Sequence, residues 1–170
     1  MKKILLFIIL FSTTFAAHAQ ERQFKFGFIS CEAAIKSMPE YTTIQKNLAD
    51  LRNKYDAETK RSENEFNKKY EEFLDGQRDF APTILQKRQA ELQNMMEKNV
   101  AFKNESRRLL LQAEKDAYAP LRAKLAAALQ TIGRERGYAF ILNTDNNAVP
   151  FVDLSQGEDV TALVRETTKQ

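Results

Sequence analysis

The chain has 170 residues, and its 26 Lys and Arg side chains against 23 Asp and Glu give a formal charge of +3 at pH 7. A single Cys excludes an internal disulfide, so the fold must be stabilised by packing or by oligomerisation. No segment approaches eighteen consecutive apolar residues, which excludes an integral membrane helix.

Residues 1–19 are predicted to be a secretory signal peptide, with two lysines, an apolar run at 4–11 and a small-x-small cleavage site at 17–19. Cleavage would place the mature chain in the periplasm with 24 basic and 23 acidic residues, a charge of +1. It would also remove His18, the one histidine, which excludes His-activated nucleophiles, His general bases and His-containing zinc sites. A lipid anchor would need a cysteine at the cleavage point, whereas Cys31 lies well inside the mature chain.

The mature chain opens with an aromatic-rich segment at residues 24–29 that alternates in the manner of a short strand. After a helical turn that begins near Cys31, Pro39 marks the first turn of a long helix. Its inner positions recur every eleven residues: Ile44, Tyr55 and Phe66; Leu48, Thr59 and Tyr70; Leu51, Ser62 and Phe73. An eleven-residue repeat advances about 3.67 residues per turn, so we expect a nearly straight helix with a narrow and partly polar seam.

A reversal is predicted near residues 75–82, where Gly76 ends one helix and Pro82 begins the next. The returning helix carries apolar residues at spacings close to a heptad, so the two helices should form an antiparallel arm of roughly 55–60 Å. Pro120 should kink the returning helix where the arm meets the body. Residues 121–132 are much richer in Ala and Leu than the arm and should be buried.

The C-terminal part is predicted to contain a strand at residues 138–142, a turn at 143–147 and a second strand at 148–152. A β-hairpin is the natural interpretation of this order. Residues 155–159 should then cap a last helix at 160–167. The fold class is therefore α+β, with an arm at 38–120 and a small β-rich body formed by 20–37 together with 121–170. Such a small body favours an oligomer with a shared core.

The chain resembles the Skp/OmpH family of periplasmic chaperones over essentially its whole mature length. Segments 26–29, 120–132, 137–143, 148–149 and 159–161 carry the resemblance, together with the charged hairpin and the signal peptide. The resemblance implies a homotrimer whose bodies form a β-rich hub, with three arms around a cavity. It also implies that unfolded outer-membrane proteins are held there without ATP.

The sequence is therefore interpreted as an ATP-independent periplasmic holdase. The alternative is a coiled-coil structural or adaptor protein of the cell envelope with one defined folded partner. An enzyme is disfavoured, because Glu71 and Glu72 diverge on a helix and Asp145 lies among turn residues. We expect no catalytic, cofactor-binding or metal-binding residues, no cofactor and no nucleic-acid partner. Cys31 is interpreted as a small buried side chain, with a reactive thiol as the alternative.

Aromatic and methionine side chains gather in the outer half of the arm, where most should simply form the seam between the helices. The alternative is that some are free for clients, because adjacent Met95 and Met96 cannot both point into one seam. The basic residues of the returning helix either keep the helices in register or form a surface for clients and for peripheral contact with membrane lipid. The candidate client-binding residues are Phe80, Met95, Met96, Phe102, Lys98, Lys103 and Arg107. The residues expected to form the oligomerisation body are Phe26, Phe28, Tyr138, Phe140, Leu142, Val149 and Phe151.

Overall fold

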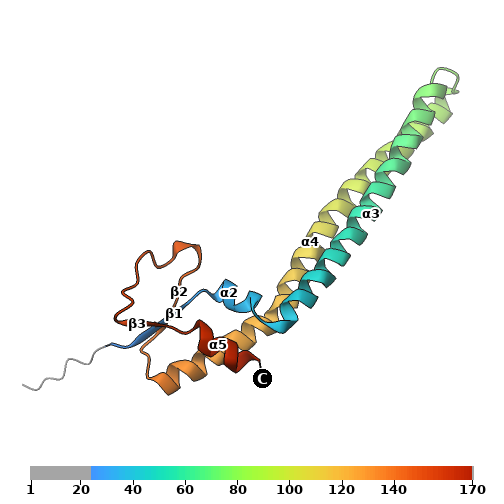
Figure 1. The fold of residues 1–170 in the computed structure, drawn as a ribbon. Helices are drawn as coiled ribbons and strands as arrows, with labels where there is room; N and C mark the ends of the chain where they lie inside the picture. Colours follow the sequence, from blue (N-terminus) through green and yellow to red (C-terminus); the bar gives the residue numbers. More distant parts are fainter. Residues whose placement is uncertain (1–23, 170) are drawn as a thin grey trace, which may run out of the picture.

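A computed structural model describes residues 24–169, and the predicted signal peptide lies outside the described residues. A small body is joined to a long antiparallel helical hairpin that projects away from it (Figure 1). The elements follow one another as β1 (Phe26–Ile29), α2 (Cys31–Lys36), α3 (Pro39–Gly76), α4 (Pro82–Arg136), β2 (Ile141–Asn143), the 3-10 turn η2 (Asp145–Asn147), β3 (Gly157–Asp159) and α5 (Thr161–Thr168).

The arm consists of α3 and the first part of α4, joined by the turn at residues 77–81. Both helices begin at a proline, whose fixed φ suits the first helical turn and whose missing N–H would have no partner there. The 38 residues of α3 give it a length of about 57 Å. Its half-buried side chains follow the predicted repeat closely, although Tyr70 is 46% exposed. No residue of α3 is fully buried, because a two-helix seam covers each side chain on one side only.

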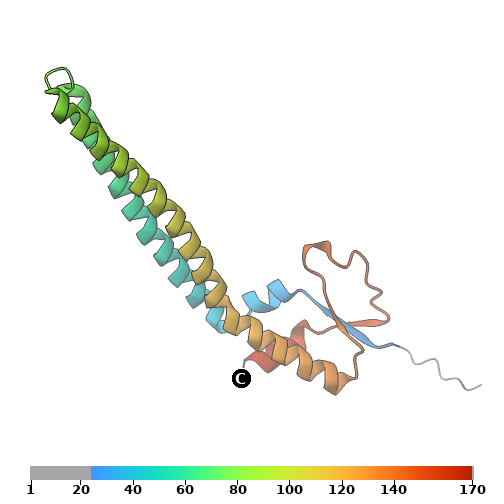
Figure 2. The same cartoon turned by 180° about the vertical axis from the view of Figure 1, so that it is seen from behind.

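The second part of α4 belongs to the body. The helix runs through Pro120 without interruption, and both ribbon views show it bending where the arm meets the body (Figure 2). Beyond the proline, Leu121, Leu125, Ala128 and Ile132 are all buried. Their spacing of four, three and four residues places them on one helical face. The prediction that residues 121–132 are buried therefore holds for this face only, since Ala126 and Ala127 on the other side are exposed. Gly137 ends the helix with a left-handed φ of 68°, a conformation that favours glycine.

The predicted β-hairpin is wrong. The sheet has the order β2-β1-β3, and β1 pairs in parallel with both of its neighbours. The segment 148–152, expected to be the second strand of the hairpin, forms no strand and belongs to the connection between β2 and β3. Pro150 lacks a backbone donor, and Asn146 and Asn147 take positive φ, so the chain turns away here instead of pairing back.

The parallel pairing has a consequence for the whole topology. Parallel strands need a long crossover, and the crossover from β1 to β2 is the entire arm with its helical root. Residues 155–159, expected to cap the last helix, mostly form β3, although Asp159 Oδ1 does accept the amide N–H of Thr161 at 2.9 Å. One sheet thereby joins an N-terminal strand, β1, to two C-terminal strands, β2 and β3, with β1 in the middle.

The body core lies between one face of the sheet and the helices α2, α4 and α5. Gly27 and Ile29 point toward the helices, and the closely packed Val160 and Val164 fill the space beside them. The observed fold is α+β, with a long antiparallel helical hairpin beside a small sheet, which confirms the predicted fold class.

Candidate functional site

Three of the candidate client-binding residues lie in the seam of the arm. Phe102 packs on Tyr55 with ring centroids 6.2 Å apart, and Phe80 packs on Phe73 at the same distance. Met95 is half-buried and lines a small hollow beside Phe80. These side chains therefore hold the two helices together, Phe102 at the middle of the arm and Phe80 and Met95 nearer the tip, and little of their surface is free.

Other candidates lie on one exposed face of α4. Met96, Lys103 and Arg107 are exposed, and so are Val100 and Leu111, which are 55% and 63% exposed. Their spacings of four, three, four and four residues place all five within one narrow stripe of the helix. We call these five residues the α4 stripe. The two neighbouring methionines point in different directions, as their adjacency required, and Met96 is the one that faces outward.

The seventh candidate does not join this surface. Lys98 is exposed, but it lies two positions after Met96 and so points to the opposite side of the helix. The structure thus separates the seven candidates into a seam group, the α4 stripe and Lys98.

The charged side chains of the arm interact mostly within one helix. Arg61 contacts Glu58 and Glu65, and Arg108 contacts Glu105, all at helical spacings. Two ion pairs join α3 and α4: Lys103 to Glu63, and Lys124 to Glu40 at 3.2 Å. These two pairs agree with the expectation that complementary charges keep the helices in register, although exposed ion pairs contribute little to stability.

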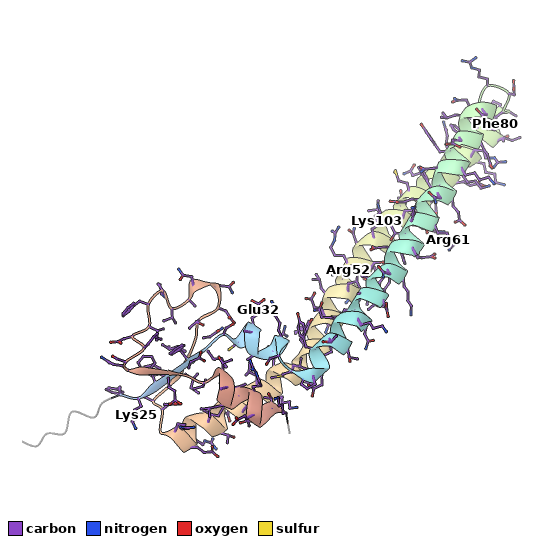
Figure 3. All side chains as sticks on the ribbon, in the orientation of Figure 1. Lys25, Glu32, Arg52, Arg61, Phe80 and Lys103 are labelled. Atoms are coloured by element: carbon purple, nitrogen blue, oxygen red, sulfur yellow. The ribbon has the colours of Figure 1, made fainter. Side chains whose placement is uncertain are left out.

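A shallow groove follows one side of the arm near its root. Two hollows of about 210 and 440 Å³ lie between residues 45–59 of α3 and 103–114 of α4, and they share Arg52, Leu110 and Glu114. We call this the lower-arm groove. Figure 3 shows Arg52 and Lys103 along this part of the arm, with Phe80 at the distant tip. Lys103 and Arg107, the two basic residues of the α4 stripe, line the larger hollow and form one wall of the groove.

A third hollow continues from the groove into the body. It has a volume of about 620 Å³ and lies between α2, the start of α3 and the body part of α4. Ile35, Tyr41 and Leu129 supply apolar surface, and Cys31 lies at its edge. Burial and the nearby Asp145 carboxylate raise the pKa of the Cys31 thiol, so the thiol is held in its less reactive form.

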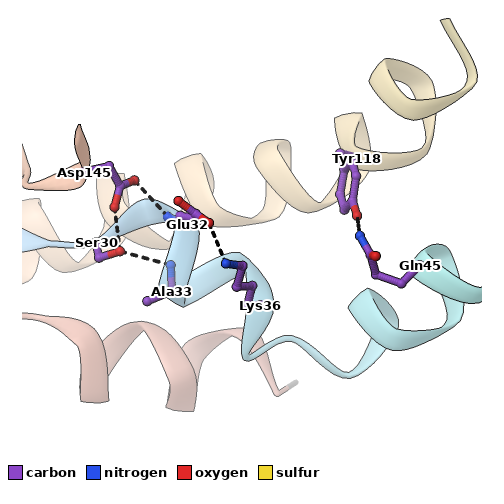
Figure 4. A network of polar contacts seen from close by, with 7 residues as sticks. All are labelled: Ser30, Glu32, Ala33, Lys36, Gln45, Tyr118 and Asp145. Carbon is purple, nitrogen blue, oxygen red and sulfur yellow. Dashed lines mark hydrogen bonds and ion pairs between the residues drawn. The ribbon is translucent and has the colours of Figure 1, made fainter. Parts of the chain in front are cut away.

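A polar network beside this hollow joins segments more than a hundred residues apart. The Asp145 carboxylate accepts the Ser30 hydroxyl at 2.5 Å and the Glu32 amide N–H at 2.9 Å (Figure 4). The Ser30 hydroxyl also accepts the Ala33 N–H and so caps α2. These hydrogen bonds lower the pKa of Asp145 and fix η2 against the start of α2.

The sheet face that points away from the helices carries most of the residues expected to form the oligomerisation body. Phe26 and Phe140 stack with centroids 5.6 Å apart, and Phe28 and Leu142 are paired in register on the same face. In the adjoining loop, Phe151 is 81% exposed, while Val149 is half-buried. Tyr138 lies elsewhere: it packs against the protomer core and donates to Glu158.

Residues 24–169 offer neither a metal-binding cluster nor a helix suited to a membrane. No group of three His, Cys, Asp or Glu side chains there could hold a metal ion. Within the same residues, no helix combines the length and the apolar character needed to cross a membrane.

Sequence reasoning missed Val100, Leu111 and the groove itself. Three consecutive leucines at 109–111 were the available indication, because no more than two of them can face one seam. The groove forms only where α3 and α4 lie side by side, so neither helix alone carries a sequence motif that indicates it.

The fold defines an arm-bearing α+β protein. The family model described as "Outer membrane protein (OmpH-like)" matches residues 25–167. The chain belongs to this OmpH-like family.

Among solved structures, the chain is similar to that of a Caulobacter crescentus protein proposed to be an OmpH-like outer membrane chaperone. The two share 14% sequence identity with a TM-score of 0.70, over 86% of this chain and 85% of the other. At this identity the likeness supports the fold alone. No curated protein matches the chain.

Proposed function

We propose that this protein is an ATP-independent periplasmic holdase that binds unfolded outer-membrane proteins and keeps them from aggregating. The observation that carries the proposal is the α4 stripe, which exposes apolar and basic side chains together along an arm of an OmpH-like protein. An unfolded membrane barrel presents many short apolar and polar segments. A long surface of weak contacts can hold several of them at once without binding any one tightly.

The proposal includes a homotrimer that forms through the body. A contiguous apolar face is unusual on a soluble monomer, and the outward sheet face gathers Phe26, Phe28, Phe140 and Leu142 beside Phe151. Packing of these faces against one another would bury them, and it would leave the three arms free around a shared space. Tyr138 would support this interface from behind, because it anchors β3 through Glu158.

The direct test uses a urea-unfolded outer-membrane β-barrel that is diluted into buffer with and without the mature protein, at trimer-scale molar ratios and without ATP. Light scattering should stay low when the mature protein is present. Unchanged scattering, from a protein shown by circular dichroism to be folded, would refute the holdase. A pull-down that recovers one folded envelope protein would then favour an adaptor.

A second test locates the binding element. Deletion of residues 59–102 removes the outer arm and leaves the body with a shortened hairpin. The deleted protein should keep the trimer mass in multi-angle light scattering and should suppress aggregation clearly less well, because Met96 and Val100 of the α4 stripe are removed with the outer arm. Full suppression by the shortened trimer would exclude the outer arm as the main binding surface.

A further inference from the structure

The lower-arm groove contains a buried polar group that lacks a partner. Ser106 is 6% exposed, and within residues 24–169 its hydroxyl has no hydrogen-bond partner. The side chain lines the larger of the two hollows, as do Thr59 of α3 and Leu110 of α4. A buried hydroxyl without a partner costs free energy in the free protein. A ligand in the groove that offers a donor or an acceptor would remove this cost.

The charges of the groove select the kind of ligand. Arg52 and Arg107 lie in it with Asp56 and Glu114, and none of the four makes an ion pair within the described residues. A lipid phosphate would be attracted by the arginines and repelled by the two carboxylates. A polypeptide backbone carries donors and acceptors side by side, and its side chains carry both charges, so it suits a groove of mixed sign.

The floor and the length of the groove fit an extended chain. Leu110 and Leu111 supply apolar surface between the charged residues, and Leu111 is the more exposed at 63%. From Gln45 to Thr59 the groove follows fourteen residues of α3, a distance of about 21 Å. An extended polypeptide covers about 3.3 Å per residue, so about six residues would fill it.

We infer that the lower-arm groove is a defined docking site for an extended segment of about six residues in an unfolded client. This inference rests on the proposed holdase function and adds a location to it. The bound segment places an apolar side chain over Leu110 and Leu111, and its backbone offers a partner to the Ser106 hydroxyl. The site lies near the root of the arm and apart from the aromatic side chains of the tip.

The test compares two positions on the same helix. Arg52 lines the groove, whereas Lys54 is exposed two residues later and so lies on the far side of α3. A benzophenone amino acid is placed at position 52 or at position 54 of the full mature protein. Each protein is illuminated with a urea-unfolded outer-membrane β-barrel after dilution. Cross-linking should be several-fold stronger from position 52, and equal yields would overturn the docking site.

Binding measurements with a fluorescent barrel provide a second readout. Leu111→Gln should weaken binding by about tenfold, because an apolar contact of this size is lost. Ser106→Ala should leave the protein folded and at least as stable, yet weaken client binding, a result that a purely structural role would not give. Unchanged client affinity in both variants would contradict the inference.

The outcomes separate the inference from the function on which it rests. If the wild-type protein suppresses aggregation but cross-links equally at both positions, the docking site fails and the holdase stands. If the wild-type protein does not suppress aggregation, the holdase itself fails. Vesicles of phosphatidylglycerol test the other occupant: if Arg52→Glu loses vesicle binding while Lys54→Glu keeps it, and client cross-linking shows no preference, the groove binds lipid and the inference is overturned.

Discussion

Asp145 offers the sharpest test of how the body is held together. Its carboxylate receives the Ser30 hydroxyl at 2.5 Å and the Glu32 amide at 2.9 Å, across 115 and 113 residues of sequence. Asp145→Asn keeps one acceptor oxygen and replaces the other with an amide donor, so one bond to a charged acceptor is lost and the second is weakened. Hydrogen bonds to charged groups contribute about 1.5–3 kcal/mol when buried. Partial exposure reduces this contribution, so we expect Asp145→Asn to lower the free energy of unfolding by about 1–2 kcal/mol.

The expected loss depends on pH in a defined direction. The hydrogen bonds lower the pKa of Asp145 in the folded protein, whereas the unfolded chain has a pKa near 3.9. A depressed folded pKa means that the stabilisation is fully present above the unfolded pKa. It disappears as the pH falls through the folded pKa. The difference between wild type and Asp145→Asn should therefore be largest at pH 7 and should shrink below about pH 4.

Urea unfolding followed by circular dichroism at one fixed protein concentration measures this difference. With a slope of about 2 kcal/mol per molar urea, the middle of the usual range, the midpoint should shift by about 0.5–1 M at pH 7. Asp153 is the matched control, since its pKa is also lowered by hydrogen bonds, but both come from Ser155 within the same loop. Asp153→Asn should change the midpoint much less. Equal shifts in the two variants, or a shift that persists unchanged at pH 3, would refute the bridging role.

Other substitutions test other parts of the structure. Gly27→Ala would place a methyl group 2.9 Å from Val160 Cγ1, inside the tightest part of the core, and should destabilise the protein by about 1–3 kcal/mol in the same urea assay. Ser106→Ala removes a buried hydroxyl without a partner, so it should raise the free energy of unfolding by up to about 1 kcal/mol and the thermal midpoint with it. A lower midpoint would show that the hydroxyl has a hydrogen-bond partner in the folded protein. Burial and the Glu158 carboxylate raise the pKa of Tyr138 to about 12, so an ultraviolet titration should show this phenol ionising well above the ordinary range of tyrosine. Its stabilising effect is complete below pH 10 and is lost as the pH rises toward 12, and Tyr138→Phe should remove that dependence.

The helices could be predicted because their determinants are local. Pro39 and Pro82 mark both starts, and the eleven-residue repeat placed the seam of α3 at the correct positions. Burial of one face of 121–132 followed from composition and helical spacing. Each of these depends on residues within a few turns of one another, which a single sequence displays directly.

The sheet could not be predicted in the same way. Residues 138–142 and 148–152 are both apolar and close in sequence, so local reasoning paired them. The actual partner of β2 is β1, more than a hundred residues earlier, and β3 is only three residues of unremarkable sequence, Gly-Glu-Asp. The Asp145 bridge and the lower-arm groove were missed for a related reason, because each exists only once distant segments have been brought together.

The exposure that a holdase needs follows from the geometry of a two-helix arm. In α3, a single stripe of side chains can enter the seam, so the flanking positions remain half exposed whatever residues occupy them. Along the arm the sequence fills the seam with aromatic pairs such as Tyr55 with Phe102, which hold the helices together. It then places Met96, Val100 and Leu111 outside that seam, where they do little for the isolated chain. In the proposed holdase, a bound client would bury these side chains, while the core of the body would keep the arm in place.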